Sequence, residues 1–152
     1  MEKKELNLLL VKVSTSHRRR SACEFMKQDL SAGQPRMLNY IFQNNGCIQR
    51  EIAKDCNLEP ASVTSVLNSM EKSGLISRTP VKGDKRALEV RLTDKGIEKK
   101  KIADEIFIAI ENECFKGFSG EEKEVAKDFL TRIHKNILNA EQQAVKNDAK
   151  TI

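Results

Sequence analysis

The most constraining feature of this sequence is the order of elements between residues 48 and 92. Apolar residues recur at helical spacing from about Gln49 to Cys56 and again from Pro60 to about Lys72. Asn57 stands in the short turn between them, where asparagine tolerates a positive φ angle better than most residues. Pro60 suits the first position of the second helix, where its missing N–H is not needed. The segment therefore predicts a helix-turn-helix.

The pattern changes period after the second helix. Gly74 is expected in a left-handed helix cap, with Leu75 folding back as its apolar contact. Leu88, Val90 and Leu92 then alternate with charged residues, which is typical of a half-buried strand. Its partner strand is expected at about residues 76–79, so the run Lys82-Gly83-Asp84-Lys85-Arg86 becomes the basic tip of a hairpin. Cys47 is a candidate for a short strand packed on this hairpin.

Helical patterns also flank this block. A first helix is expected from about Leu6 to Asp29, and a second follows the capping box formed by Ser31 and Gln34 and stops at Asn44-Asn45-Gly46. A long helix begins at Asp94 after the cap residue Thr93, and a last helix follows the capping box formed by Ser119 and Glu122. The polar tail from Ala144 is expected to fray. The positions expected to face inward are Met37, Leu38, Ile41 and Phe42, then Ile102, Ile106, Ile110 and Cys114, then Val125, Phe129, Ile133 and Ile137.

These flanking helices carry more apolar surface than one small lobe needs. We therefore expect a homodimer in which the surplus faces a second copy. The predicted fold is mainly α with a small β-hairpin. It is a single domain, 1–152, with a winged helix-turn-helix lobe at 34–96 flanked by N- and C-terminal dimerisation helices at 6–30 and 97–145.

Charge is concentrated around the hairpin. Ten basic and four acidic residues lie between Lys72 and Lys101, an excess of +6 in a chain whose formal net charge is +5. The positive surface is thus expected where a phosphate backbone would be met. For Lys99-Lys100-Lys101 a solvated helix start is the simpler interpretation.

The outer face of the second helix of the helix-turn-helix is small and polar, where a solvated helix usually carries Glu and Lys. Such side chains let a helix approach base edges and hydrogen-bond them. Asn68 is the best candidate for a two-point contact to adenine, and a merely Ser-rich exposed face is the alternative. This face consists of Ala61, Ser62, Ser65, Asn68 and Ser69, with Thr64 at its edge.

The hairpin tip suggests a second contact. Arg86 could enter a narrow A·T-rich minor groove, which concentrates negative potential. Asp84 is interpreted as a local partner that shapes the loop and orients a neighbouring guanidinium. An ordinary polar turn is the alternative. The predicted DNA-binding residues are Ser62, Thr64, Ser65, Asn68, Arg78, Asp84, Lys85 and Arg86.

An ordered series of short blocks resembles the MarR family of winged-helix transcriptional regulators. The blocks are Gln49-x-Glu51-Ile52-Ala53, Pro60-x-Ser62-Val63-Thr64, Met70-Glu71-x-x-Gly74-Leu75-Ile76, Asp84-x-Arg86-Ala87 and Val90-x-Leu92-Thr93-x-x-Gly96. The resemblance implies a homodimer, a recognition helix from Pro60 to about Lys72 in the major groove, and Arg86 in the minor groove with Asp84 as its companion. It also implies a possible small apolar or aromatic effector.

The sequence departs from the family pattern at three positions. Ile48 stands where the family often has a capping Thr, so the third helix must be capped by another residue. Glu59 replaces a usual Ser, Asp or Asn, and Ser65 replaces a longer polar or basic side chain.

The residues favour a sequence-specific regulator of double-stranded DNA with a pseudo-palindromic site, a repressor released by an effector. One alternative is a thiol-based redox sensor using Cys23, which follows an arginine cluster. Another is a winged-helix protein-interaction module. His17 and His134 lack metal-ligand spacing, no catalytic motif is present, and no cofactor is expected. The apolar run Leu8 to Val11 is too short for a signal peptide or a membrane span, so a cytoplasmic protein with free thiols is expected.

Overall fold

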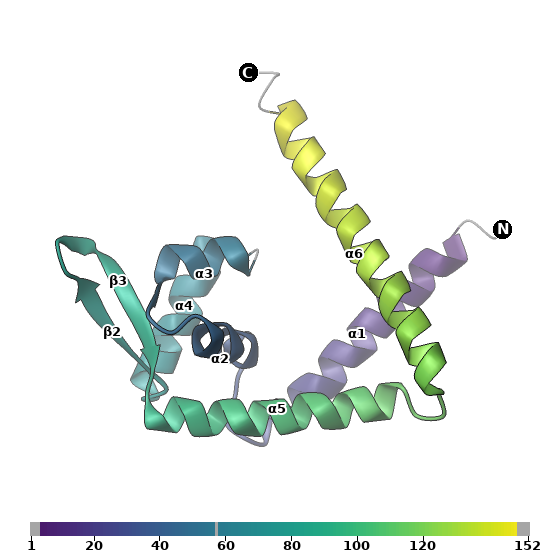
Figure 1. Cartoon of the computed structure of the whole chain (residues 1–152), viewed down its shortest axis with the longest axis horizontal. Coiled ribbons are helices and arrows are strands. Elements are labelled where there is room, and N and C mark those ends of the chain that lie inside the picture. The colour runs from purple at the N-terminus through teal and green to yellow at the C-terminus, as the bar shows by residue number, and fades with distance from the viewer. Residues whose placement is uncertain (1–3, 57, 149–152) are drawn as a thin grey trace. The chain divides into compact units, whose positions relative to one another are not determined.

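The computed structural model describes residues 4–56 and 58–148 (Figure 1). Two compact units make up the chain, Met1–Glu111 and Asn112–Ile152. Within the described residues the elements follow the order α1 (Glu5–Met26), α2 (Gln34–Gln43), β1 (Cys47–Ile48), α3 (Gln49–Asp55), α4 (Pro60–Lys72), β2 (Ile76–Val81), β3 (Asp84–Leu92), α5 (Asp94–Cys114) and α6 (Gly120–Asp148). The predicted mainly α fold with a small hairpin is confirmed.

The helix-turn-helix consists of α3 and α4. Pro60 is the first residue of α4, as predicted. The predicted role of Asn57 in the turn falls outside the described residues. At the start of α3 the Glu51 carboxylate accepts a hydrogen bond from the Ile48 backbone N–H at 2.9 Å. This bond forms one half of a capping box, because it satisfies the Ile48 N–H that is left over at the helix start, while the apolar Ile48 side chain makes no cap bond in return.

The end of α4 closes as the sequence predicts. Gly74 has a φ of 73°, a left-handed conformation that glycine adopts without steric cost. The chain then turns back, so that the Leu75 N–H donates to the Met70 carbonyl at 2.9 Å, and Leu75 is buried. This turn sends the chain directly into β2 beside the helix it has just left.

The sheet has three antiparallel strands in the order β1-β3-β2. Cys47 pairs with Val90, which confirms the expected short strand on the wing. In the β2–β3 hairpin Ile76 lies opposite Leu92 and Arg78 opposite Val90. Because side chains alternate between the two faces of a strand, these four residues share the face that covers the core. Figure 1 shows the hairpin beside α3 and α4.

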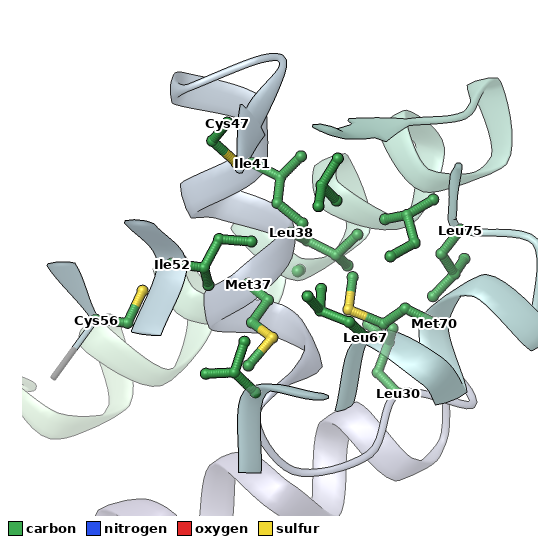
Figure 2. Packing of buried hydrophobic residues seen from close by; sticks show 14 of the residues in the cluster. Leu30, Met37, Leu38, Ile41, Cys47, Ile52, Cys56, Leu67, Met70 and Leu75 are labelled. Carbon is green, nitrogen blue, oxygen red and sulfur yellow. The ribbon is translucent and has the colours of Figure 1, made fainter. Parts of the chain in front are cut away.

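A single apolar core joins α2, α3, α4 and the sheet. Met37, Leu38 and Ile41 from α2 lie in one cluster with Leu67 and Met70 from α4, as Figure 2 shows. Each of these side chains is fully buried. Burial of one such side chain stabilises the folded state by about 1.5–3 kcal/mol, so the core fixes how the two helices of the helix-turn-helix are presented.

The N-terminal part of α5 and the C-terminal part of α1 attach to this lobe. Thr93 caps α5, since its Oγ1 accepts from the Gly96 N–H at 3.1 Å. Phe25 and Phe107 pack edge to face with ring centroids 5.1 Å apart, and the Lys99 ammonium donates to the Gln28 carbonyl at 2.5 Å. The lobe is therefore continuous with the C-terminal part of α1 and the N-terminal part of α5.

Several sequence expectations were wrong in detail. The first helix ends at Met26 rather than Asp29, because the Leu30 N–H turns back to the Phe25 carbonyl at 3.0 Å and Asp29 adopts a φ of 55°. The third helix matches its expected range of about Gln49 to Cys56, since it ends at Asp55 with Cys56 as its cap. The last helix continues through Ala144 to Asp148 rather than fraying there.

Some apolar residues expected to face inward are exposed in the single chain. Phe42 is 48% exposed. The Lys100 ammonium lies over its ring, 4.3 Å from the ring centroid. Cys114 is also exposed, which corrects its assignment to the core. Exposed apolar residues on α6 include Val125, Phe129, Ile133 and Ile137, and those on α1 include Leu6, Leu9, Leu10 and Val13. An apolar stripe shows which residues share a face, but it does not show whether the chain itself covers that face.

Candidate nucleic-acid interface

The outer face of α4 is exposed along its whole length. Ser62, Thr64, Ser65 and Asn68 lie on it, opposite the buried Val63, Leu67 and Met70. In the part of the chain that the structure describes, the side chains of Ser62 and Ser65 form no hydrogen bond. Their hydroxyls are thus available to an external partner, as both donors and acceptors.

Thr64 and Asn68 are exposed but are also tied to the lobe. The Thr64 hydroxyl accepts from the Gln49 side-chain amide at 2.8 Å and donates to the Pro60 carbonyl at 2.9 Å. The Asn68 amide oxygen accepts from the Arg78 guanidinium at 2.7 Å. These two polar groups are therefore held in fixed orientations before any ligand arrives.

Arg78 lies deeper than the other predicted contact residues whose side chains are described, with its own side chain 13% exposed. Its guanidinium donates to the Glu71 carboxylate through Nε at 3.0 Å and through Nη2 at 2.5 Å. These charged hydrogen bonds hold the pKa of the Glu71 carboxyl below its usual range. The structure thus places Arg78 between the wing and α4 rather than on the outer surface.

The wing tip has the conformation that its sequence suggests. Gly83 has a φ of 91°, which only glycine adopts readily. The Asp84 carboxylate accepts from the Arg86 backbone N–H at 2.9 Å, so it shapes the loop through the main chain. This contact is made to a main-chain N–H, whereas the sequence led us to expect that Asp84 orients a guanidinium. The side chain of Lys85 lies outside the described part of the structure.

Arg86 is exposed and borders a surface hollow between the wing and the helix-turn-helix. The hollow has a volume of about 780 Å³ and is cationic, since Arg50, Lys54 and Arg86 all line it. Its other lining residues are Gln49, Ala53, Leu58, Pro60, Val63 and Leu88. Arg86 and Leu88 of β3 both line the hollow, and the register of the hairpin shifts between Asp84 and Leu88, where Arg86 lies. The hollow therefore joins the wing arginine to the start of α4.

Four residues that form or support this surface were not predicted from the sequence. Arg50 and Lys54 lie four residues apart on α3, a spacing that puts both on one helix face. Gln49 and the buried Gln34 tether exposed side chains of α4, since Gln49 donates to the Thr64 hydroxyl at 2.8 Å and Gln34 donates from its side-chain amide to the Ser69 hydroxyl at 3.2 Å. The α3 pair had a recognisable signal in its spacing. The two glutamines had none, because their partners are distant in sequence.

The cysteines form no disulfide within residues 4–56 and 58–148. Burial raises the pKa of the Cys47 thiol to about 11 and raises that of Cys56 above its usual value. These two thiols are therefore protonated and unreactive near neutral pH. Cys23, the candidate sensor, is exposed on α1.

The described residues show neither a metal-binding cluster nor a membrane-spanning helix. Among the described residues no three His, Cys, Asp or Glu side chains are grouped so as to hold a metal ion. In the same residues, no helix combines the length and apolar character needed to cross a bilayer.

Known proteins share this arrangement. Residues 30–88 match the model of the MarR family. The uncharacterized HTH-type transcriptional regulator YdgJ of Bacillus subtilis (strain 168) is 32% identical over 115 residues, which cover 74% of this chain and 68% of that protein. The MarR protein from Peptoclostridium difficile DA00132 superposes with a TM-score of 0.80 at 26% identity, over 91% of this chain and 92% of that one.

A further solved structure contains nucleic acid. The MepR–DNA complex from S. aureus is similar with a TM-score of 0.78 at 26% identity, and the match covers 86% of this chain and 96% of that one. The sequence match to YdgJ and the shared winged helix-turn-helix agree with the small polar face of α4 and the basic wing. The chain belongs to the MarR family, and it is a DNA-binding transcriptional regulator rather than an enzyme.

Proposed function

We propose that two copies of this chain form a dimer that represses transcription by occupying a pseudo-palindromic operator. In this proposal α4 enters the major groove, Arg86 enters the adjacent minor groove, and a small apolar or aromatic effector releases the complex. The observation that carries the proposal is the exposed small polar face of α4 beside the exposed, cationic wing.

The groove assignment rests on size and charge. An α-helix fits the major groove, and the short side chains of Ser62 and Ser65 leave room for close approach to base edges. Arg86 sits on a short hairpin whose loop Asp84 pins, so its guanidinium can be presented to a narrow minor groove. Arg50 and Lys54 add positive charge that would meet phosphate.

A dimer explains how two such units would read one site. Its two-fold axis would place the two α4 helices about one turn of DNA apart. An effector would act by favouring a different spacing of the lobes, so it must bind more weakly when DNA is bound. Four free thiols fit a reducing compartment, and we place this activity in the cytoplasm.

Selection of bound duplexes from a random library tests the whole proposal. We expect a consensus of two inverted half-sites with centres about one helical turn apart. Binding that falls steeply with salt should accompany this consensus, because phosphate contacts release counterions. A consensus with a single unrepeated element, or no consensus at all, would contradict the proposed mode of binding.

The replacement Asn68→Ala should relax base preference at one position of each half-site. A two-point amide contact to adenine is worth about 1–3 kcal/mol of discrimination, and alanine cannot form it. Affinity for every singly substituted operator, measured by fluorescence anisotropy, would give the preference position by position. The other operator positions serve as the internal control. Loss spread evenly over all positions would argue against a base contact by Asn68.

The replacement Arg86→Ala should weaken operator binding by roughly ten- to hundredfold, since a hydrogen bond from a charged group is worth about 1.5–3 kcal/mol. The loss should be greatest for operators with an A·T-rich segment under the wing. Arg91→Ala is the matched control, because Arg91 is an exposed arginine of the same strand that does not line the hollow. Equal effects of the two variants would show that Arg86 does not make a specific contact.

A further inference from the structure

One guanidinium connects three elements of the DNA-binding lobe. Arg78 on β2 donates to Glu71 and Asn68 on α4, and through Nη1 it donates to the Gln49 side-chain oxygen on α3 at 3.4 Å. Gln49 in turn donates to Thr64. Because the guanidinium is planar, its donors point in fixed directions, and the acceptors around it are held in matching positions.

The register of the hairpin explains why Arg78 faces this way. It lies opposite the buried Val90, on the core face of the sheet, where a charged side chain needs partners. The Glu71 carboxylate supplies the opposite charge. Arg78 is therefore part of the lobe's internal structure, and most of its N–H donors already have an acceptor.

This contact settles which way the Asn68 amide points. Arg78 can only donate, so Asn68 must present its oxygen to the guanidinium and its NH₂ group elsewhere. The second lone pair of the oxygen and the NH₂ group remain for a base. A two-point contact to adenine requires a donor and an acceptor in a fixed order, which an amide free to turn over would not provide.

We propose that Arg78, held by Glu71, is a positioning residue that sets the base preference of Asn68 instead of contacting DNA itself. This inference rests on the proposed base contact of Asn68. It assigns Arg78 a different role from Arg86, although the sequence alone groups both among the DNA-binding residues.

The two roles differ in their response to salt. An arginine that neutralises a phosphate releases counterions, so its removal lowers the salt slope of binding by about one. An arginine that acts through Asn68 leaves that slope unchanged. Measuring both base preference and salt slope therefore distinguishes a positioning role from direct contact with DNA. An arginine that only stabilised the fold would change neither quantity.

The experiment compares Arg78→Lys, Asn68→Ala and the double variant on the operator that the wild-type chain selects. Each protein is titrated with the full set of singly substituted duplexes at several salt concentrations. We expect Arg78→Lys to lower preference by roughly thirtyfold at the same position as Asn68→Ala, the middle of the range for a two-point amide contact. The double variant should lose no more than Asn68→Ala alone, because both changes remove one interaction.

Two further variants keep the test decisive. Glu71→Gln leaves Arg78 in place but weakens its anchor, so it should shift preference in the same direction even if Arg78→Lys folds poorly. Arg91→Lys is the matched control, since Arg91 is exposed on the neighbouring strand. Thermal unfolding of each variant separates misfolding from altered recognition.

The outcomes are distinct. Additive losses in the double variant, a loss spread over all positions, or a salt slope reduced by about one would overturn the positioning role. A change of preference for Asn68→Ala but none for Arg78→Lys or Glu71→Gln would overturn it while leaving the Asn68 contact intact. No change of preference for Asn68→Ala would overturn both.

Discussion

Replacing Gly96 with alanine should lower the free energy of unfolding of the DNA-binding lobe by about 3 kcal/mol, the upper part of the usual range for overpacking. An ideal Cβ at this position would lie 2.0 Å from the Leu75 carbonyl oxygen. The obstacle is main chain, and it cannot rotate away as a side chain would.

The Leu75 carbonyl is itself engaged, because it accepts from the Thr93 N–H at 3.1 Å. Next to it, the Thr93 hydroxyl donates to the Gly74 carbonyl at 2.6 Å. Moving Leu75 to admit a methyl group would therefore disturb both the end of α4 and the start of α5. The strain falls on the junction where α4, β2 and α5 meet.

Gly120→Ala is the matched control for this prediction. Gly120 is the first residue of α6, and a Cβ there would meet nothing within 4 Å. That change should be neutral or slightly stabilising, because alanine loses less conformational freedom on folding. Urea denaturation of both variants measures the difference, and a Gly96→Ala protein as stable as the control would refute the close contact.

Local chemistry explains why the helix-turn-helix could be predicted from sequence. Pro60 can start a helix but not continue one, and Gly74 can adopt the left-handed cap that ends it. The alternation of apolar residues at Leu88, Val90 and Leu92 then predicted the strand. Each of these signals acts over a few residues, and the structure confirms each of them.

Main-chain turns and contacts between residues distant in sequence account for most of the features that the sequence did not predict. The end of α1 depends on a main-chain turn at Asp29 and Leu30, which the apolar spacing does not reveal. The Arg78 network joins residues up to 29 positions apart. It did leave one sequence signal, because alternation from the inward Ile76 places a charged Arg78 on the core face.

The sequence of the flanking helices also did not show whether the chain itself buries their apolar faces. The stripes on α1 and α6 predict a buried face, but the chain leaves both exposed. Phe129 is 54% exposed and Ile133 is 39% exposed. Soluble proteins rarely leave large contiguous apolar patches uncovered, so these faces call for a partner, and we propose a second copy of the chain.

Replacing Ile133 with aspartate should therefore convert the dimer to a monomer and weaken binding to the full operator by roughly a hundredfold or more. A charge cannot be buried in an apolar interface without a partner. The loss is large because a dimer holds its second lobe close to the second half-site once the first has bound. Analytical ultracentrifugation reports the mass, and titration of the operator reports the affinity.

Thr131→Asp introduces the same charge two residues away, on the opposite face of α6, where it should change neither quantity. A single half-site provides the second control, because an intact lobe of Ile133→Asp should bind it as well as one lobe of the wild-type dimer. A dimeric Ile133→Asp protein would exclude this face of α6 from the interface. A monomeric variant with undiminished affinity for the full operator would show instead that pairing is not how the chain reads DNA.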